Sequence, residues 1–265
     1  MIDLAFIGGG NMAEALIKGI SSGRAGSYRI TVAEPGEEKR LHLEKKYGVK
    51  ATSSNMEAVR AARTVLLAVK PQIMEGVLGE IKDGITADHT VISIAAGVRL
   101  SFLGARLGTK KLIRVMPNTP ALAGEGMTVI SLCECLEDAV ITVVKDIFMS
   151  VGKVSVMPEK YMDAVTALSG SGPAFFALFI EGLVEGAVRA GLAEQDARLL
   201  ALQTAAGTLK MLENGMDTQN LRRMVTSPGG TTEAGLKVLE GKGFKQALYD
   251  TIDAAARRAA ELGKG

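Results

Sequence analysis

The chain contains very few of the side chains that build metal centres and nucleophilic active sites. Its 265 residues include only two cysteines and two histidines, and no tryptophan. Cys133 and Cys135 are separated by one residue, a spacing that fits neither a Cys-x-x-Cys redox pair nor a zinc site. Neither His42 nor His89 lies near a recognisable nucleophile motif. We therefore expect no bound metal, no Ser-His-Asp or Cys-His catalysis, and two cysteines that serve only in packing.

Blocks of like charge and uninterrupted apolar segments of membrane-spanning length are also missing. The net charge is +2, and basic residues are interleaved with acidic ones, so nucleic acid is not an expected partner. The most apolar stretch, residues 174–192, is interrupted by Glu181 and Glu185, which favours a buried helix over a membrane span. The first residues resemble a strand. They do not resemble a signal peptide, in which a basic region is followed by an apolar one, so we expect a cytoplasmic protein without a membrane partner.

Two halves of the chain have different patterns. Residues 1–158 alternate short β-branched apolar runs with helical segments, as in a parallel sheet covered by helices. Residues 159–265 show helical periodicity throughout. We therefore predict an α/β protein with an N-terminal Rossmann-type doubly wound sheet (1–158) and a C-terminal all-helical domain (159–265). Several of the later helices are apolar over most of their circumference, so we expect them to form a homodimer interface.

The first helical segment follows a glycine-rich turn that is typical of dinucleotide binding. Gly8, Gly10 and Ala13 match the pattern G-x-G-x-x-G/A directly after a strand and at the start of a helix. The first glycine permits a tight turn, and the second lets the backbone approach a pyrophosphate, which the free N–H groups of the helix would bind. We expect Asn11 and Met12, which lie between these positions, to contact the same cofactor. The alternative is a glycine-rich turn without a ligand.

A carboxylate ends the second predicted strand. Glu34 occupies the position at which an acid accepts hydrogen bonds from the adenosine ribose and repels an additional phosphate, so it favours NADH over NADPH. Lys39 and Arg40 follow closely and could still contact a phosphate, so the choice between the two cofactors stays open. Glu34 could also be a solvated charge at the end of a strand.

Two further segments follow predicted strands, at the edge where an open α/β sheet binds its ligands. "VMPNTPA" (115–121) presents Asn118 and Thr119, with a rigid structural loop as the alternative. "LLAVKPQ" (66–72) ends the third apolar strand. We assign its lysine to positioning, although a surface charge is equally consistent with the sequence. The expected cofactor contacts of this segment are Ala68, Val69, Lys70 and Pro71.

Taken together, five motifs resemble those of pyrroline-5-carboxylate reductase: "GGGNMAEAL", "AVKPQ", "MPNTPA", "SGSGPAF" and "VTSPGGTTEAGL". The resemblance extends over nearly the whole chain, and the last two motifs are its most specific parts. It implies an oxidoreductase that reduces the ring C=N of L-1-pyrroline-5-carboxylate to L-proline, the last step of proline biosynthesis, with NADPH or NADH and without a metal. It also implies a homodimer, commonly within a larger homo-oligomer. In "SGSGPAF" we expect both a helix break and a backbone that approaches cofactor or substrate.

The resemblance assigns the loop at residues 225–236 to the substrate. It implies that Thr232, as the catalytic residue, brings its hydroxyl to the ring nitrogen. A helix that begins near Thr231 would direct free N–H groups at the substrate carboxylate, and the glycines would let the backbone come close. Without the resemblance, an ordinary turn before a threonine-capped helix fits equally well. The residues expected to bind the carboxylate are Ser227, Gly229, Gly230 and Thr231.

The adenosine end departs from the family pattern. The family usually has a small polar residue and an arginine after the second strand, whereas this chain reads "VAEPGEEKR", which makes NADH more expected than for a typical member. Asn55 matches a family position beside the adenine-side ribose and phosphate, with helix capping as the alternative. Glu159 and Arg223 match positions near the active site only loosely, and we assign them no role.

The implied reaction explains why no histidine is needed. Hydride addition to a C=N carbon leaves the electrons on nitrogen, which needs a proton or a hydrogen bond and not a nucleophile. A β-hydroxyacid dehydrogenase has the same plan but would need a lysine base. The lysines of the helical half resemble solvated helix charges: Lys210, Lys237, Lys242 and Lys245. A non-catalytic NAD(P)-binding sensor is a second alternative.

Overall fold

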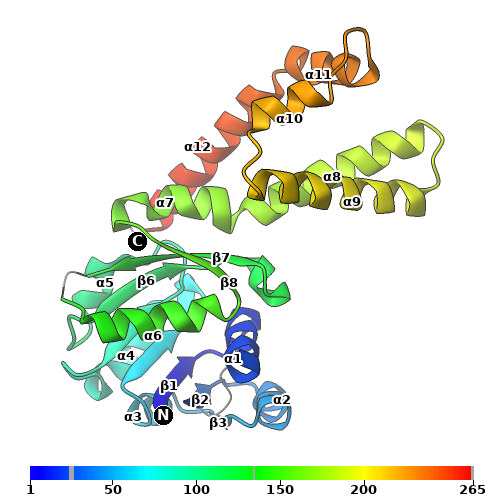
Figure 1. Cartoon of the computed structure of the whole chain (residues 1–265). Coiled ribbons are helices and arrows are strands. Elements are labelled where there is room, and N and C mark those ends of the chain that lie inside the picture. Colours follow the sequence, from blue (N-terminus) through cyan, green and yellow to red (C-terminus); the bar gives the residue numbers. More distant parts are fainter. Residues whose placement is uncertain (24–26, 134, 264–265) are drawn as a thin grey trace. The chain divides into compact units, whose positions relative to one another are not determined.

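The computed structural model describes residues 1–23, 27–133 and 135–263. The chain forms two compact units, residues 1–171 with 254–265 and residues 172–253. Figure 1 shows a sheet with its helices in the first unit and helices alone in the second.

The first unit is built on one sheet. Within the described residues, eight strands follow the order β3-β2-β1-β4-β5-β6-β7-β8. Neighbouring strands from β3 to β6 are parallel, β7 runs antiparallel to β6, and β8 is parallel to β7. The strands are β1 (Ile2–Ile7), β2 (Tyr28–Ala33), β3 (Lys50–Thr52), β4 (Thr64–Leu67), β5 (Thr90–Ser93), β6 (Leu112–Met116), β7 (Gly126–Leu132) and β8 (Gly152–Val156). The order of the first six strands confirms the predicted Rossmann-type arrangement.

Two features of the sheet were not predicted from the sequence. The connection from β6 to β7 spans only residues 117–125, which is too short for a parallel crossover, so β7 returns antiparallel. Strand β3 has three residues at the edge of the sheet and contains no apolar run, so its sequence gives no strand signal.

Helices cover both faces of the sheet. Leu4 and Phe6 contribute to the core on one face, and Ala5 and Ile7 to the core on the other, because successive strand residues alternate. Helices α1, α2 and α6 pack on the first face, and α3, α4 and α5 pack on the second. Their bounds are α1 (Asn11–Gly23), α2 (Glu37–Tyr47), α3 (Asn55–Arg60), α4 (Pro71–Ile81), α5 (Leu100–Gly104) and α6 (Asp138–Met149).

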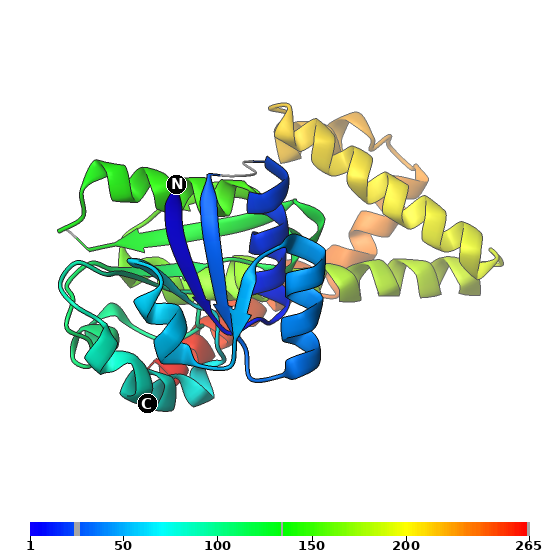
Figure 2. The same cartoon turned by 90° about the horizontal axis from the view of Figure 1, so that it is seen from below.

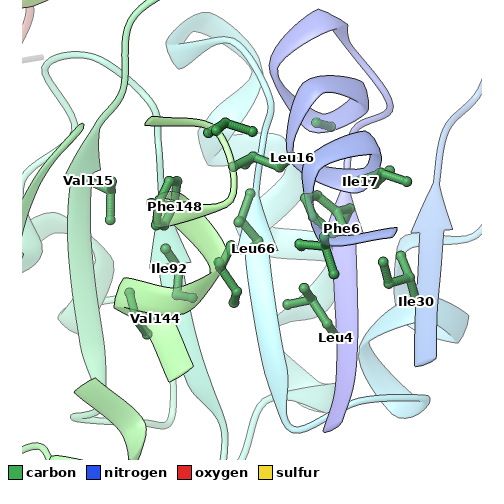
Figure 3. Close-up of a cluster of buried hydrophobic side chains, with 14 of the residues drawn as sticks. Leu4, Phe6, Leu16, Ile17, Ile30, Leu66, Ile92, Val115, Val144 and Phe148 are labelled. Atoms are coloured by element: carbon green, nitrogen blue, oxygen red, sulfur yellow. The ribbon is translucent and has the colours of Figure 1, made fainter. Parts of the chain in front are cut away.

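Helix α1 packs against the sheet through one apolar face. Ala13, Leu16, Ile17 and Ile20 are spaced i, i+3, i+4 and i+7, and all four are buried. Figure 3 shows Leu16 and Ile17 in the same cluster as Phe6 of β1. In Figure 2, α1 is the dark blue helix beside β1 and β2. Burial of one such leucine or isoleucine contributes about 1.5–3 kcal/mol. This face therefore fixes the helix, and with it the preceding glycine-rich turn.

Short helical segments connect the larger elements of the first unit. They are the 3-10 helices η1 (Lys82–Gly84), η2 (Thr119–Ala123) and η3 (Glu159–Tyr161), the short helix α7 (Met162–Val165), and the π-helical turn η4 (Thr166–Gly170).

The second unit consists of helices whose apolar side chains are largely exposed. They are α8 (Gly172–Arg189), α9 (Glu194–Glu213), α10 (Thr218–Met224), α11 (Thr231–Gly241) and the first part of α12 (Phe244–Leu262). Helices α8 and α9 pack together, and Phe179 contacts Phe244 with ring centroids 5.9 Å apart. Phe176 and Leu178 are 64% and 67% exposed. An apolar surface of this extent indicates an interface with another chain.

The expectation of a buried helix at residues 174–192 is therefore wrong for the single chain, because Gly172 is the only buried residue of α8. By length and composition alone, the helical stretch Glu159–Arg189 could also cross a membrane. Such a single helix is weak evidence for a membrane span, since a helix covered by a partner subunit has the same composition.

Candidate active site

The β1–α1 turn has the backbone shape that the glycine pattern predicts. Gly8 has a φ of +100°, and a Cβ there would lie 2.7 Å from the carbonyl oxygen of Ala68, so only glycine fits. Gly10 has no atom within 4 Å of its Cβ position, which leaves open space beside the turn. Helix α1 begins at Asn11, and Met12 is half-buried. The first N–H groups of α1 have no partners within the helix and can bind an anion.

The residues after β4 lie against this turn. The Ala68 N–H donates to the Ile7 carbonyl oxygen (2.8 Å), and Val69 Cγ1 lies 3.1 Å from the Cβ position of Gly8. Lys70 is exposed at the N-cap of α4, and Pro71 occupies the first turn. The structure therefore brings these four residues and the glycine-rich turn together at the carboxyl ends of β1 and β4.

Glu34, at the end of β2, is 8% exposed and is fixed by backbone hydrogen bonds. Its Oε2 accepts from the Gly9 N–H and its Oε1 from the Gly36 N–H, both at 3.0 Å. Each carboxylate oxygen keeps capacity for a further donor. Arg40 donates to the carbonyl oxygens of Glu34 (2.8 Å) and Pro35 (2.7 Å). Glu34 therefore stabilises the glycine-rich turn through hydrogen bonds, and it is not a solvated charge.

Asn55 begins α3, but it does not cap this helix. The N-cap is Ser54, whose Oγ accepts from the Glu57 N–H (3.2 Å). The Nδ2 of Asn55 donates to Glu80 Oε2 at 2.6 Å. Ser54, and not Asn55, therefore caps α3.

An acidic residue in the first turn of α1, which the sequence reasoning missed, connects α1 to α2. Glu14 Oε1 lies 2.9 Å from His42 Nε2 and accepts from Lys46 Nζ (3.1 Å) and the Tyr47 hydroxyl (2.9 Å). The hydrogen bond from His42, followed by those from Lys46 and Tyr47, lowers the pKa of Glu14 to about 2. The spacing of His42 and Lys46 by one helical turn is the only sequence signal for this cluster.

The β6–β7 connection contacts the "SGSGPAF" segment. Asn118 Nδ2 donates to the Ser169 carbonyl oxygen (3.2 Å), and Asn118 Oδ1 accepts from the Met127 N–H (2.8 Å). Thr119 is exposed. Nearby, buried Arg114 donates to Glu159 at 3.2 Å. Glu159, to which the sequence assigned no role, thus belongs to a structural ion pair.

In the second unit, the loop at residues 225–236 has the predicted helix start. Gly230 is the N-cap of α11, and Thr231 is its first residue. Gly229 has a φ of +71°, and the Gly230 N–H donates to the Ser227 carbonyl oxygen (3.0 Å). Ser227 and Thr231 are exposed and Thr232 is half-buried. The structure brings all five predicted substrate residues to the start of one helix.

Glu233 closes this loop. Its Oε2 accepts from the Gly229 N–H (2.6 Å), and its Oε1 pairs with Lys237 Nζ (3.0 Å). The bond from Lys237, and then that from Gly229, lowers the pKa of Glu233. Lys210 similarly pairs with Glu213 at 3.6 Å on a helix surface, so these two lysines have the solvated positions expected of them.

The described residues contain no group of three or more His, Cys, Asp or Glu side chains that could hold a metal ion. Cys133 is half-buried and Cys135 is exposed, with their Sγ atoms 2.7 Å apart and each near the Lys110 carbonyl oxygen. The expectation that both serve in packing is wrong for Cys135, because its side chain is exposed.

Comparisons with known proteins give a consistent result over the whole chain. Residues 159–262 match the family model of pyrroline-5-carboxylate reductase dimerisation, and residues 3–97 match that of coenzyme F420-dependent NADP oxidoreductases. The chain is 44% identical to the pyrroline-5-carboxylate reductase of Synechocystis, with 99% of each chain covered. It is 38% identical to that of Escherichia coli, with 98% of each covered.

Solved structures agree. A pyrroline-5-carboxylate reductase from Coxiella burnetii has a TM-score of 0.91 at 37% identity, covering 99% of this chain and 98% of that one. The Plasmodium falciparum pyrroline carboxylate reductase, solved with NADP bound, has a TM-score of 0.88 at 34% identity and the same coverage.

Proposed function

The chain belongs to the pyrroline-5-carboxylate reductase family, and on that basis we propose which of its residues carry the reaction. It is an NAD(P)H-dependent enzyme that reduces L-1-pyrroline-5-carboxylate to L-proline, the last step of proline biosynthesis. The observation that carries this conclusion is 44% identity over 99% of the chain. Neither the sensor nor the β-hydroxyacid dehydrogenase alternative is favoured. The direct test follows the loss of NADH or NADPH absorbance on addition of pyrroline-5-carboxylate; absence of turnover with both cofactors would contradict it.

The cofactor binds at the carboxyl ends of β1, β2 and β4. The pyrophosphate lies against Gly8 and Gly10 and the first N–H groups of α1, at Asn11 and Met12. The open space at Gly10 and the tight turn at Gly8 support this assignment, because a side chain at Gly10 would fill that space and one at Gly8 would collide with the Ala68 carbonyl oxygen. Glu34 and Asn55 face the adenosine end. The segment after β4 flanks the dinucleotide through Ala68, Val69, Lys70 and Pro71.

The substrate carboxylate binds at the start of α11. Ser227 and Thr231 offer hydroxyl groups, and the first turn of the helix offers N–H groups and a favourable dipole. Gly229 and Gly230 contribute the backbone shape, since the Gly229 N–H is held by Glu233. Support comes from the exposure of these hydroxyls and from the helix start at Thr231. No arginine is needed to bind this anion.

Thr232 completes the proposed substrate loop. A nicotinamide cofactor would supply the hydride, and the residues of this loop would hold the substrate by its carboxylate and its ring nitrogen. The Thr232 hydroxyl forms a hydrogen bond at the ring nitrogen, where the electron pair of the broken π bond comes to rest. Because an iminium substrate already carries its proton, orientation supplies most of the acceleration.

The cofactor is NADH in preference to NADPH. Two N–H groups hold the Glu34 carboxylate at the end of β2, so it stays close to the position of a phosphate on the adenosine ribose and repels it. Arg40, which could have bound such a phosphate, donates to backbone carbonyl oxygens instead. The ratio of kcat/KM values for NADH and NADPH tests this preference, and a ratio below one would refute it.

The enzyme is a homodimer through its helical region. We further propose that the dimers form a larger homo-oligomer, since exposed apolar side chains occur on α8, α9, α11 and α12 alike. Light scattering on the purified enzyme tests this assembly: a mass of two chains at all concentrations would refute it.

Residue 158 is proposed as the boundary between the cofactor-binding and dimerisation segments, with residues 159–171 packed as part of the first compact unit. The cytoplasm is proposed as the location. The boundary is supported by the family model that begins at residue 159, and limited proteolysis that yields no cut near this position would count against it. Cell fractionation tests the location, which a membrane-bound pool would refute.

A further inference from the structure

A widened turn joins helices α7 and α8. Residues Thr166–Gly170 form a π-helical turn, in which the Ser171 N–H donates to the Thr166 carbonyl oxygen (2.9 Å). A π turn contains more residues than an α-helical turn and disrupts the regular i→i+4 pairing of carbonyl groups. Such turns are rare and are found frequently at functional sites. Residues outside the helix also contact this turn.

Asn118 provides such a contact. Its Nδ2 donates to the Ser169 carbonyl oxygen at 3.2 Å and lies 3.4 Å from the Ser169 Oγ, while its Oδ1 accepts from the Met127 N–H at 2.8 Å. One side-chain amide therefore joins the end of β6, the start of β7 and the π turn. The side-chain amide supplies both the donor and the acceptor that these two contacts require.

A second link holds the segment that precedes the turn. Arg114 of β6 is 3% exposed and donates to Glu159 Oε1 (3.2 Å) and Asp163 Oδ1 (3.4 Å). Glu159 Oε1 also accepts from the Leu100 N–H at the start of α5 (2.9 Å). Because η3 and α7 are linked to β6 in this way, β6 and the connection that follows it fix the π turn at two places.

Strand order places this arrangement at the nicotinamide end of the sheet. In a sheet of order 3-2-1-4-5-6 a dinucleotide crosses the carboxyl ends at the switch point between β1 and β4. Glu34, assigned to the adenosine ribose, ends β2 on one side of that point. Asn118 follows β6, on the other side. The π turn therefore lies where the reacting half of the cofactor is expected.

We propose that Asn118 is a positioning residue for hydride transfer, which holds the backbone of Ser169–Ser171 as one wall of the nicotinamide site. This inference rests on the cofactor placement proposed above. Asn118 acts through the π turn, because its amide nitrogen and oxygen already bond to protein atoms. A small displacement of that wall changes the distance and angle of hydride transfer more than it changes binding.

The variant Asn118→Asp tests this role, since it keeps the acceptor for Met127 and replaces the donor to Ser169. Amide deuterium exchange in residues 166–172 is expected to accelerate. We expect kcat to fall about tenfold, a factor equivalent to the typical net contribution of one hydrogen bond, here the bond between Asn118 and Ser169. The primary isotope effect with cofactor deuterated at the transferred position should increase, while the Kd of NADH, measured by its fluorescence, stays within about twofold of the wild-type value.

Asn214→Asp is the matched control, because it makes the same chemical change at an exposed helix end and should leave all four readouts unchanged. If Asn118→Asp does not fold, Asn118→Gln moves the same donor and acceptor groups by one methylene relative to Ser169 and Met127. The same increase in isotope effect is expected from it.

Three results would overturn the proposal. Unchanged exchange in residues 166–172 would show that Asn118 does not hold the turn. A lower kcat without a larger isotope effect would show that Asn118 stabilises the fold and does not position the reacting groups. Weaker NADH binding with no other change would show that Asn118 contributes to cofactor binding only. Failure of the underlying cofactor placement is distinguishable, because normal NADH binding by Gly10→Val would reveal it independently.

Discussion

Replacing Glu34 with glutamine separates the two contributions of this side chain. The carboxylate accepts from the Gly9 and Gly36 N–H groups, so it both fixes the glycine-rich turn and places a negative charge at the end of β2. Glutamine retains one oxygen acceptor, but its NH2 group must face the other N–H. The variant should therefore lose stability and at the same time accept a phosphate that the wild-type charge repels.

The magnitudes follow from these contacts. A buried N–H without a partner costs about 1–3 kcal/mol, which corresponds to a decrease in Tm of several degrees for a chain of this size. Removing a unit charge within about 5 Å of a phosphate changes their interaction by roughly 1–3 kcal/mol at effective dielectric constants of about 20 to 80. With the loss of a ribose hydrogen bond from NADH, the NADPH/NADH ratio of kcat/KM values should increase on the order of 100-fold.

The assay compares initial rates with both cofactors and the thermal melt of the same preparation. Glu37→Gln is the matched control, because Glu37 is exposed in the first turn of α2 and accepts from neither glycine. Its ratio and Tm should stay close to those of the wild type. The reasoning would be refuted if Glu34→Gln lowered the Tm but left the cofactor ratio unchanged, since the carboxylate would then be purely structural.

Three further predictions concern separate parts of the protein. Thr232→Ala should lower kcat at least tenfold with an unchanged Kd for NADH, and Thr232→Ser should retain most of the rate; equal rates for all three proteins would exclude a role for the hydroxyl. Gly10→Val fills open space, so the fold should persist while the Kd of NADH increases at least tenfold, and a normal NADH titration would reject the pyrophosphate site. The pKa of Glu14 is lowered to about 2 in the folded chain from 4.5, so its contribution to stability is complete above pH 4.5 and is lost as the pH falls towards 2. Urea denaturation over this range should therefore show a smaller acid-induced loss for Glu14→Gln than for the wild type, and equal losses would contradict the assignment.

Local signals in the sequence predicted the elements that hold the site. The glycine pattern after β1 correctly placed the turn and the start of α1, because tight turns and close backbone approach leave only glycine as a choice at Gly8. A helix start near Thr231 was expected from the family resemblance, and α11 begins at this residue. Strand β3 and the antiparallel direction of β7 were not predicted, since an edge strand needs no apolar run and strand direction depends on connection length.

Contacts between distant residues account for most of what the sequence could not predict. The hydrogen bond from Gly9 to Glu34 spans 25 residues and that from Asn118 to Ser169 spans 51, so no local pattern predicts either bond. The helix at residues 174–192 was predicted correctly as apolar but wrongly as buried in its own chain. An apolar pattern shows that these side chains are excluded from water. It does not show whether the same chain or a second subunit buries them.

Because leucines and phenylalanines of α8 and α9 are exposed in the single chain, the stability of the folded enzyme should depend on its concentration. An oligomer whose interface replaces part of each subunit's own core melts at a temperature that rises with protein concentration. Specific activity should therefore decline in very dilute solution as subunits separate, and proline or cofactor that stabilises the assembled form should restore it. The dissociation constant of the subunit interface thus sets a lower limit on the enzyme concentration that stays active.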